Sequence, residues 1–295
     1  MKIALFVNPH SGGQTCGRKA DRVQQLLRAR RIDVDPHVTR SPAELDAAVQ
    51  ACEIEAYDVV ACMGGDGANY RLINALLKYH DNRELPPIGL IPAGRGNSFA
   101  RDLDIFSLEE GVDAILRQRP RAVDVCQFTQ GRETFHFINL MGFGFVTDAA
   151  ATAFRCRWAG DASYVIGVLF RVAGLASHHL DMEIDGRLFT GKNCFVEICN
   201  SRFTGGSMEM APHARIDDGF FDAVIVRPLS RIALVATFPR IFKGTHLHHP
   251  AVEAVRGKTA RIATRPRKAL LPDGELFGHT PTRIDIVPGR LRYLV

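Results

Sequence analysis

The first 120 residues alternate between short apolar runs and segments with helical periodicity, and the connections between them are short. The strand-like runs are Lys2–Val7, Asp33–Thr39, Tyr57–Met63 and Ile88–Ile91. The helix-like segments are Arg18–Arg31, a segment that opens at Ser41 and Pro42, Ala68–Tyr79 and Asn97–Leu103. Because parallel strands need a crossover between them, this alternation predicts a parallel sheet covered by helices on both faces.

From Asp124 onward the pattern changes, and strand-like runs dominate. They are Thr134–Leu140, Leu180–Ile184, Asn193–Ile198, Phe221–Val226, Val252–Val255, Ala260–Ala263 and Arg283–Val287. Asp185-Gly186 is a hairpin-turn signal, and helical stretches interrupt the runs at Val146–Ala176 and Ser230–Lys243. We therefore predict an α/β domain over residues 1–123 and a mainly antiparallel β-rich domain over 124–295, with the last few residues able to pack back on the first domain.

Composition narrows the class of protein. The 295 residues suffice for two domains, and 46% hydrophobic residues support a substantial core. Lys and Arg exceed Asp and Glu by 37 to 32, giving a net charge of +5. This surplus is too small for a dedicated nucleic-acid binder, but it suits weak attraction to an anionic membrane surface.

Targeting signals and disulfide patterns are not visible. The apolar run at residues 2–7 is too short for the core of a signal peptide. The apolar stretch Tyr164–Ala176 contains Arg171 and is too short to span a bilayer. The seven cysteines are scattered without C-x-x-C spacing, which is typical of reduced thiols. We expect a cytoplasmic protein.

Three glycine-containing turns fall at the carboxyl ends of predicted strands. They are Asn8–Gly13, Gly64–Gly67 and Pro92–Asn97. Ligands of parallel α/β sheets bind at this edge, glycine lets the backbone approach a phosphate, and free amides at a helix start attract anions. One such turn would mean little, because most are only tight turns. Three at one edge predict a phosphate-binding site.

Asp66 lies inside the second turn and needs its own explanation. A carboxylate beside phosphate amides repels the ligand unless a cation or a hydroxyl lies between them. Holding Mg²⁺ or orienting an acceptor hydroxyl are two uses, and a helix N-cap is the structural alternative. The Walker A and dinucleotide-binding patterns are both absent.

Seven motifs in order cover nearly the whole chain. They are NPHSGG at 8–13, GGDG at 64–67, IPAGRGNSFARDL at 91–103, VDV at 123–125, GFGF at 142–145, NSRFTGGSMEMAPHARIDDGFFD at 200–222 and LPDGE at 271–275. With these motifs the chain resembles the diacylglycerol kinase catalytic-domain family, which includes bacterial soluble lipid kinases and sphingosine and ceramide kinases. The resemblance implies an N-terminal domain like those of NAD kinase and phosphofructokinase and a C-terminal β-sandwich. It also implies transfer of a phosphate from ATP, with Mg²⁺, to a lipid hydroxyl, and ATP in a cleft between the domains.

The resemblance assigns roles by position. The nucleotide-binding set is Asn8, Ser11, Thr39, Gly64, Gly65, Asp66, Gly67, Gly94, Arg95, Gly96 and Asn97. Asp273 takes the place of the general base, with Glu275, Asp66 and Asp124 around it. A structural Mg²⁺ site would use the Asp218 carboxylate and the carbonyls of Arg215 and Phe220. Without the resemblance, residues 273–275 predict only a plain β-turn. Residues 218–219 then predict an Asp-Gly turn into the strand that begins at Phe221.

Several positions depart from the family pattern. Ala68, Tyr70 and Arg71 replace its Thr, Asn and Glu, and Arg95 and Ser98 replace its Thr and Asp. Two contacts to nucleotide or metal are therefore missing, and two arginines are added. Arg71 either lies on the solvent face of its helix, or Arg71 or Arg95 supplies positive charge to the phosphates.

A membrane contact is a further hypothesis. Ser230–Lys243 is amphipathic and basic, with Ile232, Val235, Phe238 and Phe242 beside Arg231, Arg240 and Lys243. Trp158 is also suited to an interface. A helix packed on a core shows the same apolar stripe, so the pattern alone leaves both interpretations open.

Together these features predict a cytoplasmic, peripherally membrane-associating lipid kinase that uses ATP and Mg²⁺. The leading acceptor is diacylglycerol, which would give phosphatidic acid. A sphingoid base or ceramide is the next acceptor, followed by NAD kinase activity or a catalytically weak lipid- or nucleotide-binding protein. The expected partner is a lipid alcohol, with transient membrane contact and no nucleic acid, and analogy with the family leaves a homodimer open.

Overall fold

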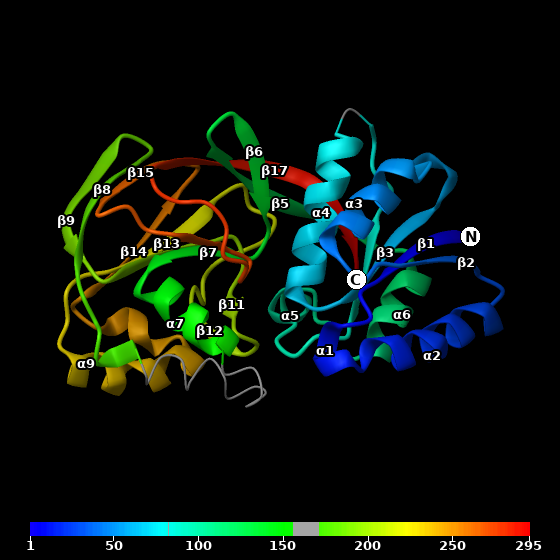
Figure 1. Cartoon of the computed structure of the whole chain (residues 1–295), viewed down its shortest axis with the longest axis horizontal. Coiled ribbons are helices and arrows are strands. Elements are labelled where there is room, and N and C mark those ends of the chain that lie inside the picture. Colours follow the sequence, from blue (N-terminus) through cyan, green and yellow to red (C-terminus); the bar gives the residue numbers. More distant parts are fainter. Residues whose placement is uncertain (82, 156–170) are drawn as a thin grey trace. The chain divides into compact units, whose positions relative to one another are not determined.

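The computed structural model describes residues 1–81, 83–155 and 171–295 (Figure 1). They form two compact units. The first unit contains Met1–Val123 and Gly289–Val295, and the second contains Asp124–Pro288. Two long strands contribute to both: β5 (Pro120–Gln130) and β17 (Thr282–Leu294). Among the described residues, no helix is long and apolar enough to cross a bilayer.

The first unit is built on a parallel sheet in the order β2-β1-β3-β4. Its strands are β1 (Lys2–Val7), β2 (Asp33–Val38), β3 (Val59–Gly64) and β4 (Ile88–Pro92). Every neighbouring pair is parallel, and Tyr293 of β17 adds a further parallel pairing at Ile88. The prediction of a parallel sheet is confirmed.

Helices cover both faces of this sheet (Figure 1). They are α1 (Ser11–Gln14), α2 (Cys16–Ala29), α3 (Pro42–Ala51), α4 (Asp66–Tyr79), α5 (Ser98–Asp102) and α6 (Leu108–Arg117), with the short turn η1 (Ile54–Ala56). Apolar side chains of α2 and α6, such as Val23 and Ile115, share one core with β1 and β3. Helices α3 and α4 lie on the opposite face. The glycine turns follow the carboxyl ends of β1, β3 and β4 and lead into the helices that come next in the chain.

The second unit contains a five-stranded antiparallel sheet, antiparallel strands that belong to the ten-stranded sheet, and a two-stranded pair. The five-stranded sheet has the order β14-β13-β10-β7-β16, with β7 (Leu140–Gly144), β10 (Phe195–Cys199), β13 (Phe221–Val226), β14 (Val252–Gly257) and β16 (Leu270–Pro272). The other strands are β6 (Glu133–Phe137), β8 (His178–Ile184), β9 (Arg187–Asn193) and β15 (Thr259–Arg265), with β11 (Phe203–Thr204) and β12 (Met208–Glu209) as a small separate pair. Strands β6, β8, β10, β14, β15 and β16 pair antiparallel with their neighbours, and β11 and β12 pair antiparallel with each other. This confirms the predicted fold class.

Helical segments cover one face of the five-stranded sheet. They are α7 (Phe145–Arg155), α9 (Arg231–Thr237), η3 (Phe238–Lys243) and η4 (Thr245–His248). Val146 and Leu234 share a core with Phe195 and Val224 of the sheet. Part of the predicted helical stretch Val146–Ala176, including Trp158, lies outside the described residues.

One predicted strand is divided. The run Thr134–Leu140 becomes the end of β6 and the start of β7, with a break at Ile138 and Asn139. The backbone N–H groups of Ile138, Asn139 and Leu140 donate to the carboxylate of Asp273. A side chain thus replaces a neighbouring strand as the hydrogen-bond partner, so the ladder stops there.

Candidate active site

The second and third glycine turns are in backbone contact. The N–H groups of Ala93 and Gly94 donate to the carbonyl of Gly64, at 2.8 and 3.1 Å. A Cβ atom on Gly94 would lie 2.4 Å from the Cα of Gly65, which is closer than any real contact. Position 94 therefore requires glycine for this close approach, and a Cβ on Gly65 would lie only 3.0 Å from the Cα of Gly94. The turns after β3 and β4 are therefore packed backbone against backbone.

The first glycine turn lies against these two turns. A Cβ atom on Gly12 would lie 2.4 Å from the carbonyl oxygen of Ala93. The Ser11 hydroxyl oxygen lies 3.3 Å from the Cβ position of Gly64, and an Arg95 guanidinium nitrogen lies 3.1 Å from that of Gly13. All three turns that the sequence singled out are therefore neighbours, and the exposed Arg95 reaches across to the first of them.

Side chains of the predicted nucleotide set hold these turns in shape. Asn97, in the left-handed conformation with φ of 50°, accepts from the Gly94 N–H and donates to the Gly94 carbonyl, both at 3.0 Å. Asn8 accepts from the His10 N–H at 3.1 Å. Thr39, buried at the end of β2, donates its N–H to the Val7 carbonyl at 2.9 Å. Gly67 lies in the first turn of α4, and Gly96 in the turn before α5.

Asp66 connects the second turn to the next helix. Its carboxylate accepts from the N–H groups of Ser98 and Phe99, at 3.0 and 3.1 Å, at the start of α5. Burial raises the pKa of Asp66, and these hydrogen bonds, together with one from the Ser98 side chain, oppose that rise. Asp66 therefore caps α5 rather than its own helix α4, whose N-cap is Gly65.

The departures from the family pattern have distinct environments. A Cβ on Gly64 would lie 2.4 Å from the Cβ of Ala68, so the contact between the strand end and α4 requires glycine at position 64. Tyr70 is buried, whereas Arg71 is partly buried. Ser98, buried, stands where the family has a carboxylate and hydrogen-bonds with Asp66 instead. That replacement avoids a close pair of like charges.

Asn69 is a residue that sequence reasoning missed. It is buried in α4, and its side-chain oxygen accepts from the Tyr293 hydroxyl at 2.9 Å. Tyr293 also packs edge-on against Phe99, with ring centroids 5.1 Å apart. These contacts join α4 and α5 to the last strand. The sequence carries no signal for such a pairing across 224 residues.

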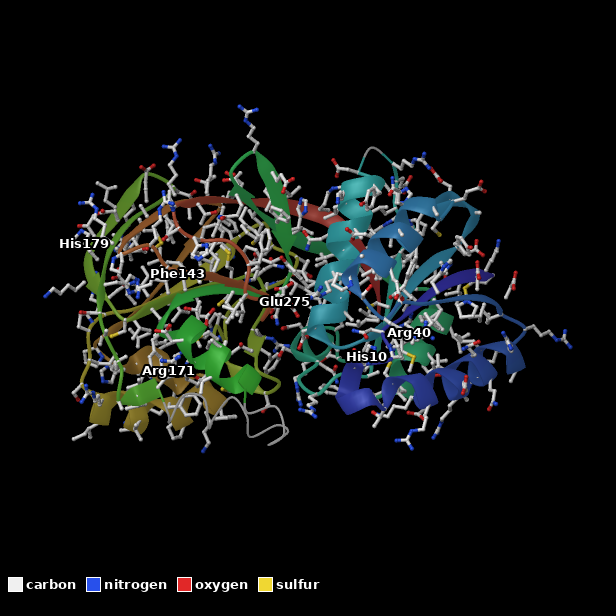
Figure 2. All side chains as sticks on the ribbon, viewed as in Figure 1. His10, Arg40, Phe143, Arg171, His179 and Glu275 are labelled. Atoms are coloured by element: carbon white, nitrogen blue, oxygen red, sulfur yellow. The ribbon has the colours of Figure 1, made fainter. Side chains whose placement is uncertain are left out.

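In the second unit, Asp273 is held by three consecutive backbone donors. Its buried carboxylate accepts from Ile138, Asn139 and Leu140 at 3.1, 2.8 and 3.0 Å. The Glu275 N–H donates to the Pro272 carbonyl at 2.8 Å, and Asp273 and Gly274 both have positive φ. Residues 272–275 are therefore a tight turn, as the residues alone indicate, and the turn also fixes the Asp273 carboxylate. Glu275 is partly exposed; its side chain is labelled in Figure 2.

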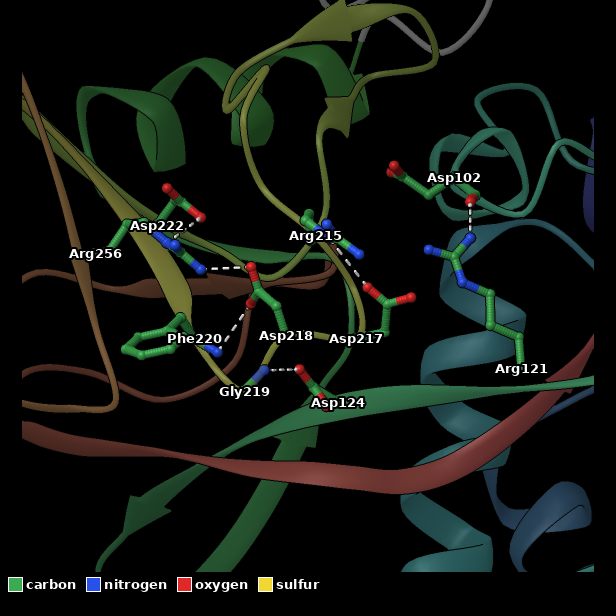
Figure 3. A network of polar contacts seen from close by, with 10 residues as sticks. All are labelled: Asp102, Arg121, Asp124, Arg215, Asp217, Asp218, Gly219, Phe220, Asp222 and Arg256. Carbon is green, nitrogen blue, oxygen red and sulfur yellow. Dashed lines mark hydrogen bonds and ion pairs between the residues drawn. The ribbon is translucent and has the colours of Figure 1, made fainter.

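Asp124 belongs to the same polar network. Its carboxylate accepts from the Gly219 N–H at 2.6 Å, as Figure 3 shows. The side chain of Asn200 donates to the carbonyl of Asp124 at 3.0 Å and to that of Ile138 at 2.8 Å. Asn200 thus joins Asp124 to the segment that Asp273 holds. Burial raises the pKa of the Cys126 thiol, and the nearby carboxylates of Asp273 and Asp124 raise it further. Asn200 was not singled out from the sequence, although it begins the motif at 200–222.

The loop at residues 215–220, which was predicted to hold Mg²⁺, lies beside the guanidinium of Arg256. Asp218 accepts from the Phe220 N–H at 3.1 Å through one oxygen and pairs with Arg256 through the other. Arg215 pairs with Asp217 at 3.4 Å (Figure 3). Because both oxygens of Asp218 are engaged and one faces a guanidinium, this donor set does not fit Mg²⁺. In residues 1–81, 83–155 and 171–295, no group of three His, Cys, Asp or Glu side chains could hold a metal.

Comparison with known proteins gives the class. Residues 2–128 match the diacylglycerol kinase catalytic domain, and residues 139–295 match the YegS C-terminal NAD kinase beta sandwich-like domain. This combination of domains defines a lipid kinase. The chain belongs to the diacylglycerol kinase catalytic-domain family.

Named relatives cover nearly the full chain. A diacylglycerol kinase of Mycobacterium tuberculosis is 27% identical and aligns over 99% of this chain and 94% of its own length. A sphingosine kinase 1 of Arabidopsis thaliana is 25% identical over 94% of this chain and 68% of its own length. The crystal structure of a diacylglycerol kinase from Bacillus anthracis superposes with a TM-score of 0.75 at 19% identity, covering 99% and 96% of the two chains. The structural likeness establishes the fold.

Proposed function

We propose that this protein transfers the γ-phosphate of ATP, in the presence of Mg²⁺, to the hydroxyl of a lipid, with diacylglycerol as the leading acceptor and phosphatidic acid as the product. The observation that carries the proposal is the convergence of three glycine turns into one surface at the ends of β1, β3 and β4. Such a surface is suited to phosphate groups. The membership of the family supports the acceptor class.

The first unit would bind the phosphoryl donor. The N–H groups of the glycine turns and of the start of α4 would donate hydrogen bonds to the phosphates. Arg95 would add positive charge beside Gly13. Asn97 and Asp66 would keep the turns rigid through the hydrogen bonds described above. ATP bound with Mg²⁺ supplies the transferable phosphoryl group. The protein's own contribution is a preorganised anion-binding surface that needs little rearrangement.

Asp273 would act as the general base. As the lipid oxygen forms its bond to the γ-phosphorus and the bond to the ADP oxygen breaks, the hydroxyl proton would pass to the Asp273 carboxylate. Three backbone N–H groups hold this carboxylate in place, so the Asp273 side chain is fixed in one position. Asp124 and Asn200 would support the segment that carries these donors.

The nature of the acceptor is a separate choice. Relatives named as sphingosine kinases make a sphingoid base or ceramide the second candidate. NAD is the third, because the C-terminal domain is NAD kinase-like. A weakly catalytic binding protein would be favoured by Ala68 and Ser98, which lack the family's metal- or nucleotide-contacting groups. The placement of Asp273 among three backbone donors favours a catalyst instead.

We also propose transient docking on an anionic bilayer through α9 and η3. Leu234 and Ile241 pack into the core, whereas Ile232 is 83% exposed, and Val235 and Phe242 are exposed as well. Exposed Arg231, Arg240 and Lys243 lie among these apolar side chains. The segment therefore has one apolar face for the core and a second apolar, basic surface toward solvent. Apolar insertion with surrounding positive charge complements anionic lipid headgroups.

An acceptor panel tests the proposed function. The full-length protein would be incubated with labelled ATP, Mg²⁺ and either diacylglycerol, sphingosine, ceramide or NAD, the lipids in mixed micelles. We expect label in phosphatidic acid. Label only in another lipid would correct the acceptor, label in NADP would refute the lipid kinase, and ATP binding without transfer would favour the binding protein.

A further inference from the structure

The loop before β13 concentrates negative charge. Asp217, Asp218 and Asp222 occur within six residues. Asp217 pairs with Arg215, the basic residue of its own loop. Asp218 and Asp222 instead face the neighbouring strand, β14, where Arg256 lies directly opposite Asp222 in the antiparallel register. Two carboxylates on one side of a loop repel each other unless a cation lies between them.

Arg256 is placed to be that cation. Its guanidinium pairs with Asp218, and its Nε lies 4.0 Å from an Asp222 carboxylate oxygen. Its Cζ lies 4.5 Å from the centroid of the Phe220 ring, so the planar group also contacts the aromatic face. Figure 3 shows Arg256 directed at Asp218 and Asp222. A planar guanidinium suits this position, because it has several donors in fixed directions for the two carboxylates and a flat face for the aromatic ring.

The loop matters because it positions Asp124. The N–H of Gly219 donates to the Asp124 carboxylate at 2.6 Å, and the carbonyl of Ile216 accepts from the Asp124 N–H at 2.7 Å. Asp124 in turn connects through Asn200 to the segment that holds Asp273. A displaced loop would therefore disturb a network of buried carboxylates.

From this arrangement we infer that Arg256 is a built-in cation that takes the place of a structural divalent ion at the loop 217–222. The Asp218 carboxylate, which the family resemblance assigned to Mg²⁺, instead pairs with the guanidinium of Arg256. The loop is consequently ordered without metal, and Arg256 acts as a positioning residue for Asp124. The inference holds whichever lipid is the acceptor, and whether or not the protein is a kinase.

The test is the effect of metal on thermal unfolding of the full chain, measured without nucleotide in chelator and in millimolar Mg²⁺. For the native sequence we expect the same Tm in both conditions. In Arg256→Ala the two carboxylates lose their cation, so Tm falls by about 3 °C or more in chelator and recovers partly with Mg²⁺. The double variant Arg256→Ala with Asp218→Asn should lose that recovery, which assigns it to this loop.

A surface pair provides the matched control. Arg227, which directly follows β13, pairs with Glu253 of β14 at 3.0 Å, and its exposure is similar to that of Arg256. Arg227→Ala should change Tm little and show no Mg²⁺ response. A native Tm that rises with Mg²⁺ and falls in chelator would overturn the inference, even if no Arg256 variant folds. So would an Arg256→Ala protein with native Tm and no response to Mg²⁺.

Discussion

Asp66 and Asp273 each accept hydrogen bonds from consecutive backbone N–H groups. The sequence marks both as site carboxylates, but their donors lie 32 to 135 residues away along the chain. Residue type and local spacing carry no information about such distant donors. The two residues could therefore be proposed as site carboxylates from the sequence, whereas the hydrogen bonds that anchor them could not be predicted.

Gly94→Ala tests the contact between the glycine turns. The added Cβ would overlap the backbone of Gly65, and backbone cannot move as a flexible side chain does. We expect ATP affinity to fall at least ~10-fold, with a loss of stability of about 1–3 kcal/mol. Gly17→Ala is the control, because the nearest atom to its Cβ would be 3.6 Å away. Native ATP affinity in Gly94→Ala, measured by calorimetry, would contradict the proposed phosphate site.

Arg95→Thr, which restores the residue usual in the family, tests the charge beside the first turn. Removing a guanidinium near bound phosphates should weaken ATP binding by roughly 5- to 10-fold, in line with the loss of one charge-assisted hydrogen bond. Arg28→Thr, on α2, is expected to leave affinity unchanged. Equal or tighter binding of ATP by Arg95→Thr would show that Arg95 does not contact the phosphates.

Glu197 should give the protein a pH-dependent stability. It lies opposite Gly142 in the sheet register, and burial raises the pKa of its carboxyl to about 8. The folded state retains a proton that the unfolded chain releases above pH 4.5. The free energy of unfolding therefore decreases from pH 4.5 toward pH 8, by at most about 1.4 kcal/mol per unit.

Glu197→Gln removes this titration, so its free energy of unfolding should vary less between pH 5 and pH 8, as followed by urea unfolding. The exposed Glu133→Gln serves as the control and should keep the native slope. An unchanged slope in Glu197→Gln would mean that the carboxyl is ionised in the folded protein at neutral pH.

At the scale of elements, periodicity and caps predicted most of the structure. The strands Lys2–Val7 and Phe221–Val226 begin and end where expected, and Ser41 caps α3 as expected. Helix α6 was not predicted, although Ser107 and Glu110 form a capping box at its start. The strand at 134–140 is broken by Asp273, a residue that no local pattern connects to it.

The surface of α9 and η3 tests the docking proposal at this scale. Ile232→Glu replaces an 83% exposed apolar side chain with a negative one, so we expect at least ~10-fold weaker binding to vesicles that contain anionic lipid, with unchanged Tm. Leu188→Glu is a matched control, because Leu188 is 70% exposed but lies on β9. Salt-insensitive vesicle binding, or an equal loss in both variants, would contradict docking through this surface.

At the scale of the whole molecule, the order of seven motifs carried more information than any one motif. A single glycine turn or Asp-Gly pair has a plain structural interpretation, and several of those interpretations also hold here, as for the turn at Asp273. Motifs spread over the whole chain, by contrast, predicted the family and the combination of α/β and β-rich parts. The lipid could not be predicted, because apolar side chains that contact acyl chains resemble ordinary core residues.

The most direct test of the account is phosphate transfer from labelled ATP to diacylglycerol by the native protein and by Asp273→Asn, with ATP affinity and Tm measured for both. Asparagine keeps one acceptor oxygen for the backbone donors but cannot take up the hydroxyl proton as a carboxylate does. We predict that the native protein forms phosphatidic acid and that Asp273→Asn does so at least ~100-fold more slowly while still folded and binding ATP. Native rates in Asp273→Asn, or no transfer by the native protein, would contradict the assignment of Asp273 as the base of a lipid kinase.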